Sequence, residues 1–228
     1  MHTLTTHNGL ALPAVGLGTW QMTGTACTQA VVQALELGYR HIDTATAYEN
    51  EADVGAALRA SHVPREQIHL TTKVWWDSLS PKAMRQSLEA SLRALGTEHV
   101  DLFHIHWPGK DWDLARSIET LVALREEGKA RHIGVANFPL GLLRHATETL
   151  GAPLPAIQLE YPALPGHPPL LAHARSTASL LTAYTPLAPP PPPALPPIHA
   201  LAPHPAVPPP PPPLTPPLHH ARVPVTPH

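Results

Sequence analysis

Short β-rich runs alternate with longer amphipathic runs over most of this chain. Residues 4–12 predict a hairpin that turns at Asn8 and Gly9, because Asn-Gly favours the tight turn between two antiparallel strands. Seven further β-rich runs follow, separated by runs with the apolar spacing of helices. These β-rich runs end near residues 19, 43, 73, 106, 137, 158 and 184. Strand–helix units of roughly thirty residues predict an α/β protein with a (β/α)8 TIM barrel.

Local signals mark where the helices begin and end. Ser80 precedes Pro81, the order typical of an N-cap followed by a first helical turn. Gly38, Gly96 and Gly128 each follow a run of helical spacing, and glycine commonly ends a helix. A doubly wound open sheet is the alternative fold, but no predicted strand is followed by the Gly-x-Gly-x-x-Gly turn of dinucleotide-binding sheets. The pattern therefore favours the barrel.

The strand–helix rhythm stops at Pro189. Nineteen of the 31 prolines lie between Pro189 and Pro227, and no aspartate or glutamate occurs after Glu160. Proline removes a backbone donor and interrupts helices, so this segment is expected to be extended, as in polyproline II. We predict a barrel over 1–188 and a proline-rich, extended or disordered tail over 189–228. Only residues 222–226 of the tail have β character, so the barrel is predicted to be incomplete, with unpaired edges on its first and seventh strands.

The composition limits the class of protein. The net charge is −2, whereas a protein that binds nucleic acid would normally carry a basic surface. No run of about eighteen apolar residues is present, and the first residues lack the charge and apolar run of a signal peptide. A single cysteine, Cys27, cannot form an internal disulfide, which fits a reducing compartment. We expect a cytoplasmic monomer that acts on a small molecule, without a nucleic-acid or membrane partner.

Polar and ionisable residues stand at the predicted C-terminal ends of the strands, where a parallel barrel carries its active site. They are Asp43, Lys73, His106, Asn137 and Gln158, and Tyr48 follows in the loop after the second barrel strand. A tyrosine phenol has a pKa of about 10 and is a poor acid at neutral pH unless a cation lies close. Lys73 could supply that charge, Asp43 could hold the lysine, and His106 could orient a substrate oxygen. Tyr48 would then donate a proton as hydride arrives from a nicotinamide.

Six motifs in register resemble those of the aldo-keto reductase family. Residues 38–45 (Gly-Tyr-Arg-His-Ile-Asp-Thr-Ala), followed by Tyr48, Glu51, Val54 and Gly55, match the family's first signature without a mismatch. The other five motifs are residues 71–75, 101–108, 133–138, 158–161 and 183–187. The resemblance covers about residues 4–188 and is to the bacterial branch that is 2,5-diketo-D-gluconate reductase-like.

The resemblance implies a barrel enzyme that reduces aldehydes or ketones with NADPH. By position, the residues that match the family's catalytic tetrad are Asp43, Tyr48, Lys73 and His106. The residues that match cofactor contacts are Thr19, Asn137, Gln158, Tyr184, Thr185 and Leu187. Asn137 and Gln158 would bind the nicotinamide carboxamide, and the ring of Tyr184 would stack on the nicotinamide. Trp20, Trp75 and Trp107 would form the apolar wall of the substrate pocket. No metal is implied.

The sequence also departs from the family pattern. Ala136 stands where the family usually has serine, which removes a hydroxyl near the carboxamide. The family's seventh and eighth helices have no counterpart of helical composition. The Lys-Ser pair and downstream arginine that would bind an adenosine 2′-phosphate are absent, although residues 223–228 resemble the approach to that motif. NADPH is therefore expected from the family alone, and NADH is a possible cofactor.

Simpler interpretations exist for several of these residues. Asp43 and Lys73 could be a buried ion pair that only closes the barrel. His104 and His106 have a His-x-His spacing that can bind zinc, but we favour His104 as a packed histidine of the barrel. Trp76 is interpreted as a core residue and Cys27 as an inert one.

The function has an alternative as well. An active reductase is the favoured hypothesis, and a reductase-like scaffold with weak or no cofactor binding is the other, because an incomplete barrel cannot close. The abrupt change in composition is also compatible with a reading-frame or sequencing error at the C-terminal end.

Overall fold

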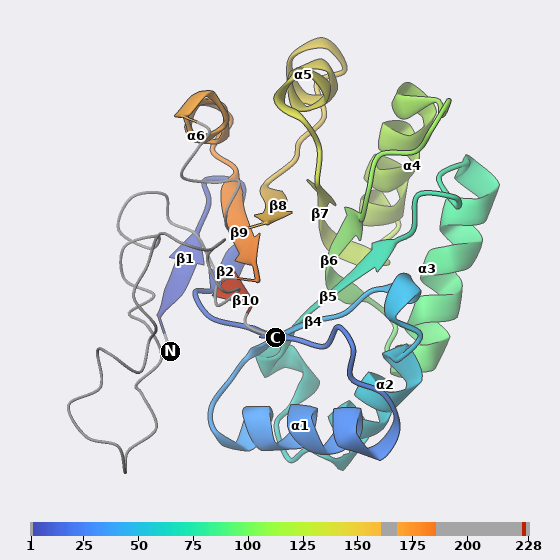
Figure 1. The fold of residues 1–228 in the computed structure, drawn as a ribbon, viewed down its shortest axis with the longest axis vertical. Helices are drawn as coiled ribbons and strands as arrows, with labels where there is room; N and C mark the ends of the chain where they lie inside the picture. Colours follow the sequence, from blue (N-terminus) through green and yellow to red (C-terminus); the bar gives the residue numbers. More distant parts are fainter. Residues whose placement is uncertain (1, 161–167, 186–224, 227–228) are drawn as a thin grey trace, which may run out of the picture.

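The computed structural model describes residues 2–160, 168–185 and 225–226, in which eight parallel strands curl into a barrel with helices on its outside (Figure 1). Each strand pairs with its neighbours in sequence order. A consecutive order without a reversal is that of a barrel, so the alternative of a doubly wound sheet is wrong. The strands are β3 (Leu17–Gly18), β4 (His41–Asp43), β5 (His69–Val74), β6 (Val100–Ile105), β7 (Ala130–Ala136), β8 (Ala156–Glu160), β9 (Leu180–Tyr184) and β10 (Val225–Thr226).

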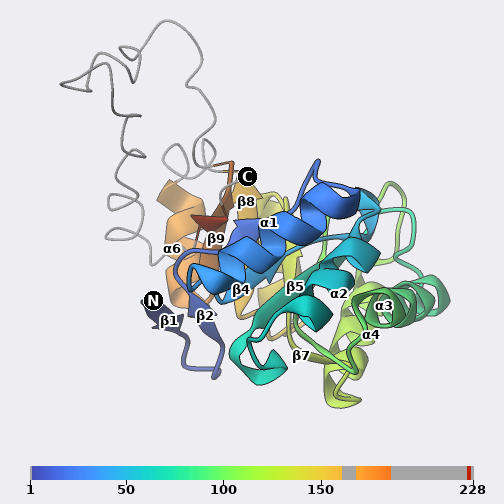
Figure 2. The same cartoon turned by 90° about the horizontal axis from the view of Figure 1, so that it is seen from below.

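Helices connect most of the strands, and successive helices from α1 to α4 lie side by side around them (Figure 2). The α-helices are α1 (Gly24–Glu36), α2 (Glu51–Ala60), α3 (Pro81–Leu95), α4 (Leu114–Glu126), α5 (Leu140–Arg144) and α6 (Pro168–Ser176). Two short 3-10 helices, η1 (Thr46–Tyr48) and η2 (Arg65–Gln67), and a π-helical turn, η3 (His145–Thr149), complete the described helices. Within the described part of the chain, no helix has both the length and the apolarity that a bilayer span requires.

The capping signals read from the sequence act as expected in α3. The Ser80 hydroxyl accepts a hydrogen bond from the Ala83 amide at 3.3 Å, and Pro81 occupies the first turn. Gly96 ends the helix with φ 70°, in the left-handed region that favours glycine. These features define both ends of α3, the helix that follows β5, and β5 carries Lys73.

The C-terminal end differs from the prediction in one respect. Val225 and Thr226 form β10, which pairs in parallel with Ala183 and Tyr184 of β9. The prediction of an unpaired edge on the seventh strand is therefore wrong at these two positions. Among the described residues no pairing joins β10 to β3. The rest of the predicted tail, residues 189–224 and 227–228, lies outside the described residues, and the division at 188 stays a prediction.

The structure has two apolar cores, one outside the strands and one at the N-terminal end of the barrel. The larger lies between the outward faces of the strands and the helices, and its fully buried members include Ile42, Phe103 and Val135. The smaller lies at the N-terminal end of the barrel, where the hairpin of β1 (Thr3–Thr5) and β2 (Ala11–Pro13) packs Leu4, Leu10 and Leu12 against inward-facing residues of β6, β8 and β9. The hairpin therefore closes the end of the barrel opposite to the strand C-termini.

The barrel interior contains histidine rings where such barrels usually hold branched aliphatic residues. His41 and His69 meet edge to face with ring centroids 5.2 Å apart, and His104 is fully buried on β6. Burial in the barrel lowers the pKa of His41 to about 4 and of His104 to about 3, with Lys73 also acting against protonation. These rings are therefore neutral at neutral pH.

Glycines on neighbouring strands provide the space for these rings. A Cβ on Gly134 would lie 2.5 Å from the Ala156 carbonyl oxygen and 2.5 Å from His104 Nε2. A Cβ on Gly16, just before β3, would lie 2.4 Å from His41 Nδ1. Substitution at either glycine would displace the buried rings beneath the strand C-termini.

We expect Gly134→Ala to lower the free energy of unfolding by about 2 kcal/mol or more, because an added methyl in a packed interior forces strain. Chemical denaturation at neutral pH measures the change. Gly141→Ala is the matched control, since a Cβ there meets nothing within 4 Å. In α5 that change should be neutral or stabilising by up to about 1 kcal/mol. Equal stability of the two variants would contradict this view of the interior.

Candidate active site

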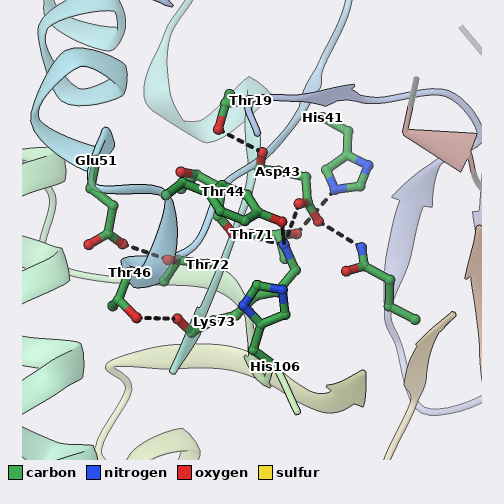
Figure 3. A network of polar contacts seen from close by, with 12 residues as sticks. Thr19, His41, Asp43, Thr44, Thr46, Glu51, Thr71, Thr72, Lys73 and His106 are labelled. Atoms are coloured by element: carbon green, nitrogen blue, oxygen red, sulfur yellow. Dashed lines mark hydrogen bonds and ion pairs between the residues drawn. The ribbon is translucent and has the colours of Figure 1, made fainter. Parts of the chain in front are cut away.

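Three neighbouring strands and the loop after β4 bring the predicted tetrad together at the C-terminal end of the barrel. Asp43 ends β4, Lys73 lies one residue before the end of β5, and His106 directly follows β6. Tyr48 ends η1, in the loop after β4. Figure 3 shows Asp43 and Lys73 pointing toward each other with His106 beside them. Residues 63 positions apart in the sequence thus meet because parallel strands all end at one edge.

Lys73 is the centre of the polar network. Its side chain is fully buried and forms an ion pair with Asp43 Oδ1. The same ammonium group donates to the Thr44 carbonyl oxygen at 2.9 Å and to the Tyr48 hydroxyl at 3.4 Å. All three donor positions of the ammonium are therefore directed at oxygen atoms of the β4–η1 segment.

Burial and pairing shift the pKa values of Asp43 and Lys73 in opposite directions. Burial alone would raise the pKa of Asp43, but Lys73, then His41, and hydrogen bonds from Lys73 and Gln158 outweigh it and hold that pKa below its usual value. Burial alone would lower the pKa of Lys73, but Asp43 and Tyr48 raise it above the usual value. Both groups are therefore charged at neutral pH.

Tyr48 and His106 stay uncharged beside this pair. Burial raises the pKa of Tyr48, and the opposing effect of Lys73 is smaller. Burial and then Lys73 lower the pKa of His106 to about 3. The two rings meet edge to face with centroids 5.6 Å apart, and Trp75 packs against His106 at 5.0 Å. The phenol thus keeps its proton at neutral pH, and the imidazole is neutral.

Further hydrogen bonds connect side chains of the later strands to the tetrad. Gln158 Nε2 donates to Asp43 Oδ2 at 2.8 Å. Asn137 Nδ2 donates to the His106 carbonyl oxygen at 3.0 Å, and Asn137 Oδ1 accepts from the Tyr184 hydroxyl at 2.8 Å. Side chains from β8 and β9 and from the residue after β7 are therefore held against the tetrad.

Asn50 is a site residue that the sequence reasoning did not single out. It is fully buried, accepts from the Thr44 hydroxyl at 2.8 Å, and donates to the carbonyl oxygens of Thr19 and Met22 at 2.7 and 2.8 Å. It occupies the N-cap position of α2 without a side-chain cap hydrogen bond. An asparagine at a helix start suggests a local cap, whereas this one holds the loops after β3 and β4 together.

A cavity of about 1060 Å³ opens beside the tetrad. Its lining includes Tyr48 and His106 together with most of the predicted ligand contacts, which are Trp20, Trp75, Trp107, Asn137, Gln158, Tyr184 and Thr185. Trp76 was interpreted as a core residue, and this is wrong, because its side chain is 46% exposed and does not line the cavity.

One predicted cofactor contact, Thr19, is not at the cavity wall. Thr19 is fully buried, and its hydroxyl donates to the Asp43 carbonyl oxygen at 3.1 Å. Thr19 is not among the lining residues. Leu187 lies outside the described residues.

The loops around the cavity carry most of the backbone strain. Six described non-glycine residues have positive φ, and five of them follow the C-terminal end of a strand: Gln21, Glu49, Asp111, Asn137 and Thr185. Such conformations cost free energy and persist where the surrounding contacts impose them, commonly near functional sites.

No group of three or more His, Cys, Asp or Glu side chains among the described residues could hold a metal ion, and the zinc alternative for His104 and His106 finds no third ligand there. His104 lies inside the barrel as a packed histidine. Cys27 is buried in α1, and burial and then Asp53 raise its pKa to about 11, so its thiol is unreactive at neutral pH.

Comparison with known proteins identifies relatives. A profile of the Aldo/keto reductase family matches residues 14–190. Methylglyoxal reductase DkgB from Escherichia coli O157:H7 is 42% identical over 145 residues, which are 63% of this chain and 54% of that protein. The structure of an aldo/keto reductase from Brucella melitensis is 35% identical with a TM-score of 0.77, covering 82% of this chain and 73% of that one. A protein assigned as 2,5-diketo-D-gluconic acid reductase B is 40% identical with a TM-score of 0.75, covering 81% and 66%.

The chain belongs to the aldo/keto reductase family. Within it, the chain is similar to bacterial enzymes of the DkgB and 2,5-diketo-D-gluconic acid reductase kind, which confirms the resemblance read from the sequence. The chain spans about half the length of the curated relatives that it matches.

We expect Asp43→Asn to lower the free energy of unfolding at pH 7 by about 3 kcal/mol or more, because it leaves the buried Lys73 without its carboxylate. Without Asp43, burial lowers the folded-state pKa of Lys73 below its unfolded value, so the unfolded state binds more protons. The stability deficit should therefore shrink as the pH rises toward about 10. Denaturation curves over this pH range measure it.

The matched control is Glu89→Gln, which removes one carboxylate from the exposed Lys129–Glu89 pair, whose N–O distance is 2.6 Å. Exposed pairs of this kind contribute little to stability, so Glu89→Gln should change the free energy of unfolding far less than Asp43→Asn does. If Asp43→Asn and Glu89→Gln lower the free energy of unfolding equally, the buried Asp43–Lys73 pair contributes no more to stability than an exposed pair does.

Proposed function

We propose that this chain reduces the carbonyl group of small aldehydes or ketones to an alcohol, with hydride from NADPH or NADH and with Tyr48 as the proton donor. The observation that carries the proposal is the position of the Lys73 ammonium. It donates to both Asp43 and the Tyr48 hydroxyl, directly behind the cavity wall. Together with family membership, this supports a carbonyl-reducing centre.

Tyr48 has the contacts that a general acid needs. Its oxygen accepts from Lys73, so its own proton is available to a substrate oxygen in the cavity. Burial keeps the phenol protonated until a substrate oxygen becomes more basic, and the nearby ammonium stabilises the phenolate that remains. Asp43 and Gln158 hold the ammonium in this position.

His106 can position the carbonyl oxygen. It lines the cavity, and its ring is neutral. A neutral imidazole can donate one hydrogen bond to an oxygen without taking a proton from it. We assign it the role of fixing the substrate oxygen close to the Tyr48 hydroxyl.

The cavity residues fit a nicotinamide. Asn137 and Gln158 present amide groups, Tyr184 presents a ring, and the buried Thr185 hydroxyl has no partner among the described residues. The volume of about 1060 Å³ leaves room for a small substrate beside the nicotinamide. A nicotinamide cofactor bound by these residues would supply the hydride that the carbonyl carbon accepts. Thr185, and Leu187 by its position in the sequence, would contact the pyrophosphate.

The substrate is a small carbonyl compound in this proposal. Trp20, Trp75 and Trp107 line the cavity with apolar surface, and Trp75 packs against His106. The DkgB relative is named for methylglyoxal, a small dicarbonyl, and we propose methylglyoxal as the first substrate to test.

We expect Tyr48→Phe to lower the turnover of an aldehyde by at least about a hundredfold, because it removes the general acid and keeps the ring. The measurement is the rate of NADPH oxidation with methylglyoxal at saturating concentrations. Binding of NADPH, followed by quenching of tryptophan fluorescence, should change little.

Tyr39→Phe is the control, because Tyr39 precedes β4 and lies at the opposite end of that strand from Asp43. Its turnover should equal that of the wild type. A Tyr48→Phe variant with wild-type turnover would exclude Tyr48 as the proton donor. Failure of the wild-type protein to bind NADPH would instead support the alternative of a reductase-like scaffold.

A further inference from the structure

The turn after β3 presents Trp20 to the cavity. Residues 19–22 form a four-residue turn, in which the Met22 amide donates to the Thr19 carbonyl oxygen at 3.1 Å. Trp20 is the second residue of this turn, and its side chain is 46% exposed and lines the cavity. The conformation of the turn therefore decides where the indole ring stands in the cavity wall.

The turn is strained at the residue next to Trp20. Gln21 has φ 63°, in the left-handed region that glycine or asparagine adopts most readily at the third position of a turn. The backbone amide and the hydroxyl of Thr19 donate to the Asp43 carbonyl oxygen at 3.0 and 3.1 Å, and Figure 3 shows this hydroxyl directed at Asp43. These two bonds hold the first residue of the turn, whereas the strain lies at the third. Strain of this kind persists only where surrounding contacts impose it.

The Asn50 amide joins the two ends of this turn. Its Nδ2 atom donates to the carbonyl oxygens of Thr19 and Met22, the first and last residues of the turn, at 2.7 and 2.8 Å. Its Oδ1 atom accepts from the Thr44 hydroxyl at 2.8 Å, and the side chain is fully buried. The nitrogen and the oxygen of the amide are both used in this way, so the side chain has a defined orientation and holds the turn closed around Trp20.

Asn50 is also connected to the tetrad. It follows Tyr48 by two residues, and its own carbonyl oxygen accepts from two amides in the first turn of α2. Thr44, which donates to the Asn50 side chain, directs its carbonyl oxygen to Lys73 Nζ at 2.9 Å. One buried amide thus links the turn that carries Trp20 to the segment that carries the proposed proton donor.

We propose that Asn50 is a positioning residue for carbonyl reduction, and that it acts through Trp20 by holding the turn in the conformation that places the indole ring against bound substrate. The proposal rests on the proposed reductase function. Asn50 does not itself line the cavity, so its effect must pass through the turn. Asp43, Lys73 and Tyr48 keep their own contacts without it, so substrate binding should suffer more than the chemical step.

The first test is Asn50→Ala, which removes the amide and its hydrogen bonds to Thr19, Met22 and Thr44. At saturating NADPH we expect the KM of benzaldehyde to rise about tenfold, because the substrate loses its contact with one aromatic ring, and kcat to change by less than about threefold. The rise should be smaller for methylglyoxal, which offers the ring less apolar surface. Asn50→Asp keeps the size and the acceptor but removes the amide donors. It should act in the same direction, and it replaces the alanine variant if that variant does not fold.

Asp53→Ala is the matched control. Asp53 lies three residues after Asn50, and its Oδ2 atom accepts from the Gly24 amide at 2.7 Å, two residues beyond the turn. This substitution removes a hydrogen bond between α2 and the same loop but leaves the contacts of residues 19–22 in place. The KM of benzaldehyde should therefore change by less than about twofold. An equal rise of the KM in both variants would overturn the specific role of Asn50.

Two double variants show whether Asn50 acts through the turn and Trp20. In a Trp20→Ala background, Asn50→Ala should change the KM by less than about twofold, since two residues that act through one contact are not additive. Adding Gln21→Gly to Asn50→Ala should lower the KM again, because glycine adopts the left-handed conformation without strain and the turn then forms without the Asn50 side chain. A general loss of packing at Asn50 would not be reversed by a change at residue 21.

The turn can also be observed in the protein without substrate. With 5-fluorotryptophan in place of all five tryptophans, the fluorine NMR resonance of Trp20 is the one that Trp20→Phe removes. Asn50→Ala should shift or broaden this resonance, whereas Asp53→Ala should not. The resonance of Trp112, whose ring packs against Phe138 with centroids 5.9 Å apart, should stay in place in both variants.

The outcomes distinguish the role of Asn50 from the reductase function. An unchanged Trp20 resonance in Asn50→Ala, or the same rise of the KM with and without the Trp20 ring, would overturn the positioning role and leave the reductase function standing. No turnover of either aldehyde by the wild type would overturn the reductase function and the role of Asn50 in it. The fluorine spectra would in that case still show whether Asn50 holds the turn.

Discussion

The buried ion pair between Asp43 and Lys73 is the interaction on which the rest of the site depends. Two charges removed from water must be compensated by well-placed partners, or the pair costs more than it contributes. Here the partners come from several elements: the Thr44 carbonyl, the Tyr48 hydroxyl and the Gln158 amide. The need to satisfy one ammonium and one carboxylate thus fixes the relative positions of β4, η1, β5 and β8. The same contacts present Tyr48 to the cavity.

The histidines packed beneath the ion pair are neutral. His41 and His104 fill the barrel interior beneath it, where Gly16 and Gly134 leave room for their rings, and both have lowered pKa values. Strain is concentrated in the loops above it, at Glu49 and Asn137 among others. The close-packed barrel interior therefore supports the ion pair from below. The loops above it carry groups that would contact substrate and cofactor.

The sequence was sufficient to predict the barrel and the grouping of the tetrad, because strand spacing alone places Asp43, Lys73 and His106 at one edge. It could not reveal the role of Asn50, since a residue at a helix start looks like a local cap until the loop from β3 is seen against it. It indicated β character at residues 222–226 but not the pairing of Val225 and Thr226 with β9, because a run that contains Pro224 suits only a strand end or an edge. Trp76 was misplaced because its position after β5 does not determine which way the ring points.

The proposed function requires that hydride from a nicotinamide cofactor reach the carbonyl carbon while Tyr48 supplies the proton of the new hydroxyl. The most direct measurement is the reduction of methylglyoxal by NADPH dideuterated at C4, with the product analysed by mass spectrometry and NMR. The account predicts an alcohol with one deuterium on the former carbonyl carbon and an unlabelled hydroxyl in ordinary water. Product without deuterium at that carbon, or no oxidation of NADPH in the presence of the aldehyde, would contradict it.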